Sequence, residues 1–228
     1  MQIVVNHLTR MQAGYICVAG INTSNGQHIR PVQHGRLTTH YLALNGGPFG
    51  VASLVDLGPV KYCGHPPELE DHSFHFLNVN PIGIMPPEQF WEQLQIVARR
   101  SITEIFGSAI KSLGRGCIVN VGTGKASLGC LIPAAPPTLL VTSNGQIRAD
   151  ITDGTFSVNL SVTDIRLYET DHKTPKENLI QQINTRIQSG ISVIVGVGLT
   201  RPWKHPDDIV ERHYLQVNNL HLQDNLVW

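Results

Sequence analysis

Two arginine–proline pairs have the chemistry to bind phosphate or a nucleobase. Arg30 precedes Pro31, and Arg201 precedes Pro202 and Trp203. Proline holds the residue before it in extended geometry, and the planar arginine fork suits bidentate contacts to phosphates and bases. A neighbouring tryptophan provides a surface for base stacking. The ligand-binding residues that we predict are Arg10, Arg30, Arg36, Thr200, Arg201 and Trp203.

Arg10 and Arg36 join this set through their positions in the chain. Arg10 ends a Leu-Thr-Arg phrase that returns at residues 199–201, and Arg36 follows the strand of Arg30. The alternative is a structural role, in which these arginines tie loops to carboxylates such as Asp56 or Asp164. The sequence leaves both interpretations open.

One loop has the residue types of a zinc site. Its candidates are Cys63, His65, His72 and His75. A strand over residues 72–76 would direct His72 and His75 to opposite faces, and no C-x-x-C motif stands nearby. We therefore predict neither a metal nor another cofactor, and expect Cys130, in an apolar run, to pack as a small hydrophobe.

The signals for catalysis are weak. The glycine-rich stretch at 122–127 lacks the first glycine of a phosphate-binding P-loop, because residue 119 is valine, and Ala126 replaces its serine or threonine. A metal-dependent hydrolase or nuclease would need converging carboxylates, for which Asp150, Asp153 and Asp164 are the candidates. We favour a non-catalytic binding module and keep this enzyme as an alternative.

The elements that must position these residues repeat along the chain. Thr-Ser-Asn-Gly-Gln occurs at residues 23–27 and again at 142–146, and Asn-Gly predicts a hairpin with a type I′ turn. Each half also contains one predicted helix. The first spans about 87–106 between a proline pair and Gly107, and the second spans about 175–189 from a capping box to Gly190.

Both halves follow the order β-β-β-α-β-β, which is the order of the OB-fold. We predict a mostly β, α+β protein with two tandem OB-fold-like barrels packed together. The first domain covers 1–133, with long loop insertions at 34–50 and 63–86, and the second covers 134–228. Proline-rich residues 133–137 form the expected linker.

Phrases near both ends of the chain resemble one known family. Residues 14–21 and 29–32 are similar to the N-terminal signature of the dual OB domain proteins, and 197–203 and 213–218 to their C-terminal signature; Val162–Arg166 also fits. The resemblance implies a paired OB-fold that binds nucleic acid or a nucleotide, and is compatible with a module of bacterial defence systems. It implies no reaction.

Composition limits the class of ligand. The 228-residue chain is 41% hydrophobic and carries 17 basic and 17 acidic residues, with aromatic residues at 6%. A general binder of nucleic acid needs a basic field and stacking rings, so a small or specific ligand fits better. No leader or membrane segment is recognisable, which predicts a cytoplasmic protein with no membrane partner. A protein-interaction adaptor, with a protein partner, is the remaining alternative.

Overall fold

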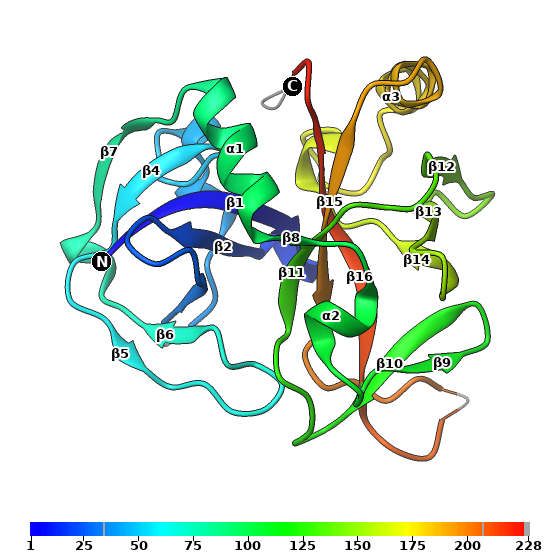
Figure 1. Ribbon diagram of the computed structural model, residues 1–228. Helices are drawn as coiled ribbons and strands as arrows, with labels where there is room; N and C mark the ends of the chain where they lie inside the picture. Colours follow the sequence, from blue (N-terminus) through cyan, green and yellow to red (C-terminus); the bar gives the residue numbers. More distant parts are fainter. Residues whose placement is uncertain (34, 207, 226–228) are drawn as a thin grey trace.

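The computed structural model of the chain describes residues 1–33, 35–206 and 208–225. Its strands form three sheets, of seven, six and three strands. Figure 1 shows them as two lobes side by side, with β1 to β7 in one and the remaining strands in the other. The mostly β, α+β architecture predicted from the sequence is confirmed.

The sheets are built from segments distant in the sequence. In spatial order, the seven-stranded sheet contains β5 (Lys61–Tyr62), β6 (Asp71–Ser73), β3 (His28–Val32), β2 (Ile16–Asn22), β1 (Gln2–Arg10), β4 (Ser53–Asp56) and β7 (Asn80–Ile84). The six-stranded sheet contains β8 (Ala98–Arg99), β11 (Leu128–Leu131), β15 (Val193–Leu199), β16 (Arg212–Leu222), β10 (Gly116–Asn120) and β9 (Lys111–Leu113). The third contains β12 (Thr138–Val141), β13 (Ile147–Thr152) and β14 (Ser157–Ser161).

Three α-helices lie in the described part of the chain: α1 (Pro87–Val97), α2 (Ile102–Phe106) and α3 (Glu177–Gln188). The predicted helix over 87–106 is therefore wrong in its middle. Ser101 caps α2 by accepting a hydrogen bond from the Glu104 N–H at 3.1 Å, which is the start signal of a new helix. Ala98 and Arg99 instead pair in parallel with β11.

The second helix is closer to its prediction. Ile180, Ile183 and Ile187 are buried on one face of α3, and Gly190 follows its end with φ of 97°. Its expected threonine cap does not form: the N-cap residue is Lys176, without a side-chain cap, and the Thr174 hydroxyl donates to Asp171. The helix accordingly begins at Glu177 instead of near residue 175.

Both repeated phrases form hairpin turns, between β2 and β3 and between β12 and β13. The type I′ prediction is wrong, because such a turn needs two central residues with positive φ. Here only the glycine of each Asn-Gly pair has one, 72° at Gly26 and 74° at Gly145. The predicted 63–86 loop is also more ordered than expected, since it contains β6 and the edge strand β7.

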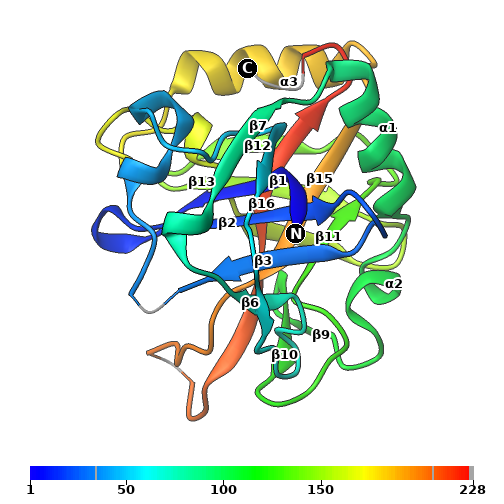
Figure 2. The ribbon, with the colours of Figure 1, turned by 90° about the vertical axis from the view of Figure 1, so that its left-hand side faces the viewer.

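The two lobes meet through a buried polar seam. The Leu8 N–H of β1 donates to Asn219 Oδ1 of β16 at 2.7 Å, and His221 Nε2 donates to the Asn6 carbonyl at 3.0 Å. Figure 2 shows β1, β2 and β3 crossing in front of β15 and β16 at this seam. The seam fixes the faces of the two sheets relative to each other.

Side-chain packing divides the chain into two cores. One core draws most of its members from residues 3–98, and the other lies entirely within 102–222. Strand β11, at residues 128–131, pairs with β15 beyond the expected linker. The boundary at 133–137 stays a prediction; a division by packing falls nearer to 98–102.

Among the described residues, no helix is both long enough and apolar enough to span a membrane.

Candidate nucleic-acid interface

A cleft of about 560 Å³ opens between the two lobes. One wall comes from the end of β1, from β2 and β3, and from the loop after β3, and the opposite wall comes from β15, β16 and Thr163. Of the six predicted binding residues, five line this cleft: Arg10, Arg30, Arg36, Thr200 and Arg201. Residues up to 191 positions apart are brought together because β1–β3 face β15 and β16.

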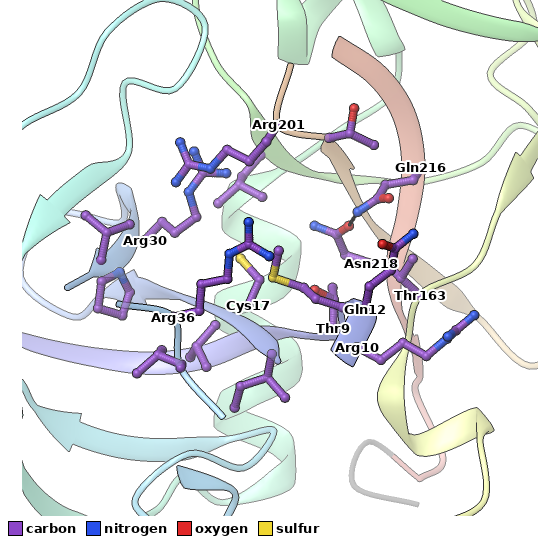
Figure 3. A pocket seen from close by; sticks show the side chains of 18 of the residues that line it. Thr9, Arg10, Gln12, Cys17, Arg30, Arg36, Thr163, Arg201, Gln216 and Asn218 are labelled. Atoms are coloured by element: carbon purple, nitrogen blue, oxygen red, sulfur yellow. Dashed lines mark hydrogen bonds between the residues drawn. The ribbon is translucent and has the colours of Figure 1, made fainter. Parts of the chain in front are cut away.

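The charged side chains that line the cleft are all arginines. Within the described part of the chain, no aspartate or glutamate belongs to the lining. In Figure 3, Arg30, Arg36 and Arg201 lie at one side of the cleft, whereas Arg10, Thr163 and Asn218 lie at the other. The arrangement suits a ligand with negative charge at one end and hydrogen-bonding groups at the other.

Carboxylates behind the wall hold two of these arginines in place. Arg30 Nε donates to Asp71 Oδ1 at 2.5 Å, and Arg201 Nη1 lies 2.8 Å from Asp71 Oδ2 and 2.8 Å from Glu68 Oε1. Burial lowers the pKa of Arg201, but the carboxylates of Asp71 and Glu68 outweigh it, and the pKa lies above its ordinary value. The carboxylates thus hold both guanidinium groups in a fixed orientation.

The same two arginines retain capacity for a ligand. Arg30 Nη2 is buried and has no hydrogen-bond partner among the described residues. The Arg201 side chain is 45% exposed despite its two carboxylates. Buried donors without partners are rare in folded proteins, so Arg30 Nη2 marks a position where an acceptor from a ligand would be stabilised.

Arg36 and Arg10 are held by aromatic rings. The Arg36 Cζ atom lies 5.3 Å from the centroid of the Tyr15 ring, and Arg10 Cζ lies 4.0 Å from that of Tyr168. Arg10 Nη1 also donates to the His172 carbonyl at 3.1 Å. In the described ranges neither arginine has a carboxylate within ion-pair distance, so neither is occupied by an ion pair within the chain.

Trp203 lies outside the cleft. It pairs with Arg212 across a short bridge, and its ring makes edge contacts with His205 at 5.3 Å and Tyr214 at 5.4 Å between centroids. The described lining of the cleft contains no aromatic side chain. The structure therefore separates Trp203 from the arginines with which the sequence grouped it.

Glu70 connects the arginine wall to the second lobe. Its carboxylate accepts hydrogen bonds from the Ser127 N–H at 2.8 Å, the Ser127 hydroxyl at 2.7 Å and the Leu128 N–H at 3.2 Å. Its carbonyl accepts from the Arg30 N–H at 2.8 Å. Burial raises the pKa of Glu70 above its ordinary value. This buried contact sets the spacing of the two walls beside Arg30.

The carboxylates weighed for a nuclease serve other contacts. Asp150 pairs with Arg115, and Asp153 accepts a hydrogen bond from the Ile102 N–H at the start of α2. Asp164 is fully buried and forms an ion pair with Arg166. Among the described residues, the Cys63, His65, His72 and His75 side chains do not form a metal-binding group. The glycine-rich stretch at 122–127 is the connection between β10 and β11.

Sequence reasoning missed the polar residues of the opposite wall. Gln216 Nε2 donates to Asn218 Oδ1 at 3.0 Å, and Thr163 anchors this wall by donating to the Val217 carbonyl. Residues 216 and 218 alternate with buried Val217 along β16, and this period of two is the signal that could have assigned them to one face.

One known protein family matches this chain. The family profile described as a dual OB-containing domain matches residues 1–220. The chain belongs to the dual OB-containing family. The match confirms the predicted resemblance and the paired OB architecture, because it covers both lobes.

No curated protein matches this dual OB-containing chain. Among solved structures, the comparison found that of a murine DNA-binding protein bound with double-stranded DNA. Its sequence identity to this chain is 8% and the TM-score is 0.32. The similarity covers 97% of this chain and 96% of the other. At these values it carries no argument about fold or ligand.

Proposed function

We propose that the chain binds a short single-stranded segment of nucleic acid, or a nucleotide, in the cleft between its lobes, without catalysis. The observation that carries this proposal is the convergence of four arginines on a cleft whose described lining contains no carboxylate. Arg36 and Arg201 are the proposed phosphate contacts, and the free Nη2 of Arg30 the proposed contact to a base edge or a second phosphate.

The position of the cleft supports this proposal. OB-folds bind oligonucleotides across the face of their second and third strands, and here β2 and β3 supply Cys17, Arg30 and Pro31 to the lining. The polar wall of Thr163, Gln216 and Asn218 offers donors and acceptors that suit base edges. The bacterial defence context implied by the family resemblance forms part of the proposal, with the nucleic acid as the recognised partner.

Size and charge limit the ligand to a few nucleotides. The cleft volume lies within the range of about 300–1,000 Å³ of small-molecule pockets. The chain carries 17 basic and 17 acidic residues, so long-range attraction of a polyanion is absent. For about two phosphate contacts on a single strand, the slope of log K against log salt would be about −1.4.

Fluorescence anisotropy with labelled single-stranded RNA, single-stranded DNA, duplex DNA and a nucleotide tests the proposal. We expect binding to a single strand or a nucleotide that weakens with salt and is reduced at least about tenfold in an Arg36→Ala, Arg201→Ala double variant. Arg115→Ala is the matched control, because that side chain is 77% exposed and lies away from the cleft.

Two results would overturn this proposal. One is the absence of binding to all four probes at tens of micromolar protein, which would favour the protein-interaction adaptor. The other is equal loss of affinity in the double variant and in Arg115→Ala, which would indicate diffuse attraction instead of a site. Circular dichroism of each variant separates loss of contact from loss of fold.

A further inference from the structure

Two histidines and a cysteine meet at the seam between the sheets, and none of the three lines the arginine cleft. His7 comes from β1, His28 from β3 and Cys130 from β11, and one ligating atom of each lies within 4.8 Å of the others. Cys130 Sγ and His28 Nε2 are 3.8 Å apart. In a tetrahedral zinc site, Zn–S of about 2.3 Å and Zn–N of about 2.0 Å place such donor atoms about 3.5 Å apart.

We propose that His7, His28 and Cys130 bind one zinc ion. Zinc binds well to thiolate and imidazole, whereas magnesium and calcium prefer oxygen ligands. The site goes beyond the proposed nucleic-acid binding and does not depend on it.

Unpartnered polar atoms support this site. His7 Nε2 and Asn6 Oδ1 are buried and have no hydrogen-bond partner among the described residues. Asn6 Nδ2 lies 3.3 Å from Cys130 Sγ and 3.1 Å from His28 Nε2, so a half-turn of the amide brings Oδ1 to the same centre. The Asn6 oxygen is therefore the fourth ligand in this proposal.

The surroundings hold the His7 ring in position. Asn218 Nδ2 lies 3.3 Å from His7 Nδ1 on the side that leads to the arginine-lined cleft. A Cβ atom at Gly196 would lie 3.1 Å from two atoms of the His7 ring, so glycine provides the space that this ring occupies. The contact with Asn218 and the space at Gly196 together fix the orientation of the His7 ring.

The protonation states of the three groups fit a site that exchanges protons for the cation. Burial lowers the pKa of His7 well below its ordinary value and that of His28 to about 4, so both imidazoles are neutral. Burial raises the pKa of Cys130 to about 12. Zinc is bound by thiolate, so binding at Cys130 would release a proton.

A second cleft gives the ion a route to the seam. His28 is half-buried and lines a cleft of about 630 Å³ together with Tyr62, His72 and Arg99. An access path is one of the requirements of a real metal site. Entry through His28 leaves the arginine-lined cleft undisturbed.

Metal analysis of the full chain by inductively coupled plasma mass spectrometry tests the site. After incubation with excess zinc and dialysis, we expect about one zinc ion per chain. Folded wild-type protein that retains less than about a tenth of an ion per chain would overturn the proposal. This first measurement needs no variant.

Substitutions then locate the ion. Cys130→Ala and, separately, the half-buried His28→Ala should each lower retained zinc at least about tenfold, whereas Cys117→Ala should retain it. Cys117 is the matched control, because it is a buried cysteine of the same sheet outside the cluster. Cobalt in place of zinc should give a thiolate charge-transfer band that is present in Cys117→Ala and absent in Cys130→Ala. If all three variants retain the metal equally, the ion is bound elsewhere and the proposal fails.

Discussion

At the scale of single residues, Arg30 and Arg36 line the same cleft but are held differently. The Arg36 guanidinium lies over Tyr15 without an ion pair in the described ranges. Its replacement by alanine should change the free energy of unfolding by less than about 0.5 kcal/mol.

The Arg36→Ala change should also weaken nucleic-acid binding and reduce the magnitude of its salt slope by about 0.7 for a single strand. Anisotropy titrations at several salt concentrations measure this slope; an unchanged slope would show that Arg36 contacts no phosphate.

Arg30 should behave in the opposite way. Its side chain is 4% exposed and pairs with Asp71, which is 9% exposed. Removing one partner of a buried ion pair costs about 3–5 kcal/mol, although Arg201 still contacts Asp71 and should reduce this loss. We expect Arg30→Ala to lower the free energy of unfolding in urea by about 2–4 kcal/mol. A loss below about 0.5 kcal/mol would assign Arg30 to ligand binding alone.

The candidate residues could be predicted only in part from the sequence. Arginine before proline at a strand end is a local pattern, and it pointed to Arg30 and Arg201, which the structure places in one cleft; their role in binding stays a prediction. Trp203 lies outside this cleft although it is two residues from Arg201, and its role in binding stays a prediction. Cys130 and His28 are 102 positions apart, and no spacing rule relates them.

At the scale of elements, Glu70 fixes the first sheet to β11. Glu70→Ala would leave the Ser127 N–H, the Ser127 hydroxyl and the Leu128 N–H without their acceptor. Since each unsatisfied buried group costs about 1–3 kcal/mol, we expect a loss of about 3 kcal/mol or more in urea unfolding. Glu70→Gln, which keeps an acceptor and a donor in the same shape, should lose less than half as much. Equal losses in both variants would contradict this account of the contact.

Long periodic elements were predictable, and short ones were not. The isoleucines of α3 repeat with the period of a helix, and β15 is a continuous apolar run. Both patterns are visible in the sequence alone. By contrast, β5 and β6 span two and three residues and depend on strand pairing for their existence, since β6 pairs with β3 and β5 pairs with β6. The break between α1 and α2 carried a local signal, Ser101 followed by Glu104, that the continuous apolar pattern of the region concealed.

At the scale of the whole molecule, the seam between the lobes should make stability depend on pH. Burial, with a smaller contribution from Arg166, lowers the pKa of His221 to about 3, whereas an unfolded chain has a value of about 6.5. Below about pH 6.5 the unfolded chain therefore binds a proton that the folded chain does not. The free energy of unfolding should fall by about 1.4 kcal/mol per pH unit from this group, down to its folded pKa.

His221→Gln isolates this contribution. Between about pH 7.5 and about pH 5, wild-type protein should lose about 2 kcal/mol more stability than the variant does. Urea unfolding of both proteins at the two pH values measures the difference. Equal losses would show that His221 is protonated in the folded state.

The pairing of the lobes follows from the family fold, but their interleaving could not be predicted. The linear order of elements indicated two barrels with a boundary near 133–137, whereas β11 precedes that boundary and pairs with β15 beyond it. Non-local strand pairing leaves no mark in composition or periodicity. The cleft lies where β1–β3 face β15 and β16, so its walls could be found only in three dimensions.

Hydrogen–deuterium exchange with and without the best-binding oligonucleotide tests the central claim most directly. The account predicts protection in peptides that contain residues 9–12, 16–18, 30–33, 35–37 and 199–201, which line the arginine cleft. It predicts no change around 25–29 and 96–99 at the second cleft. Protection confined to the second cleft, or to the segment around Trp203, would contradict it.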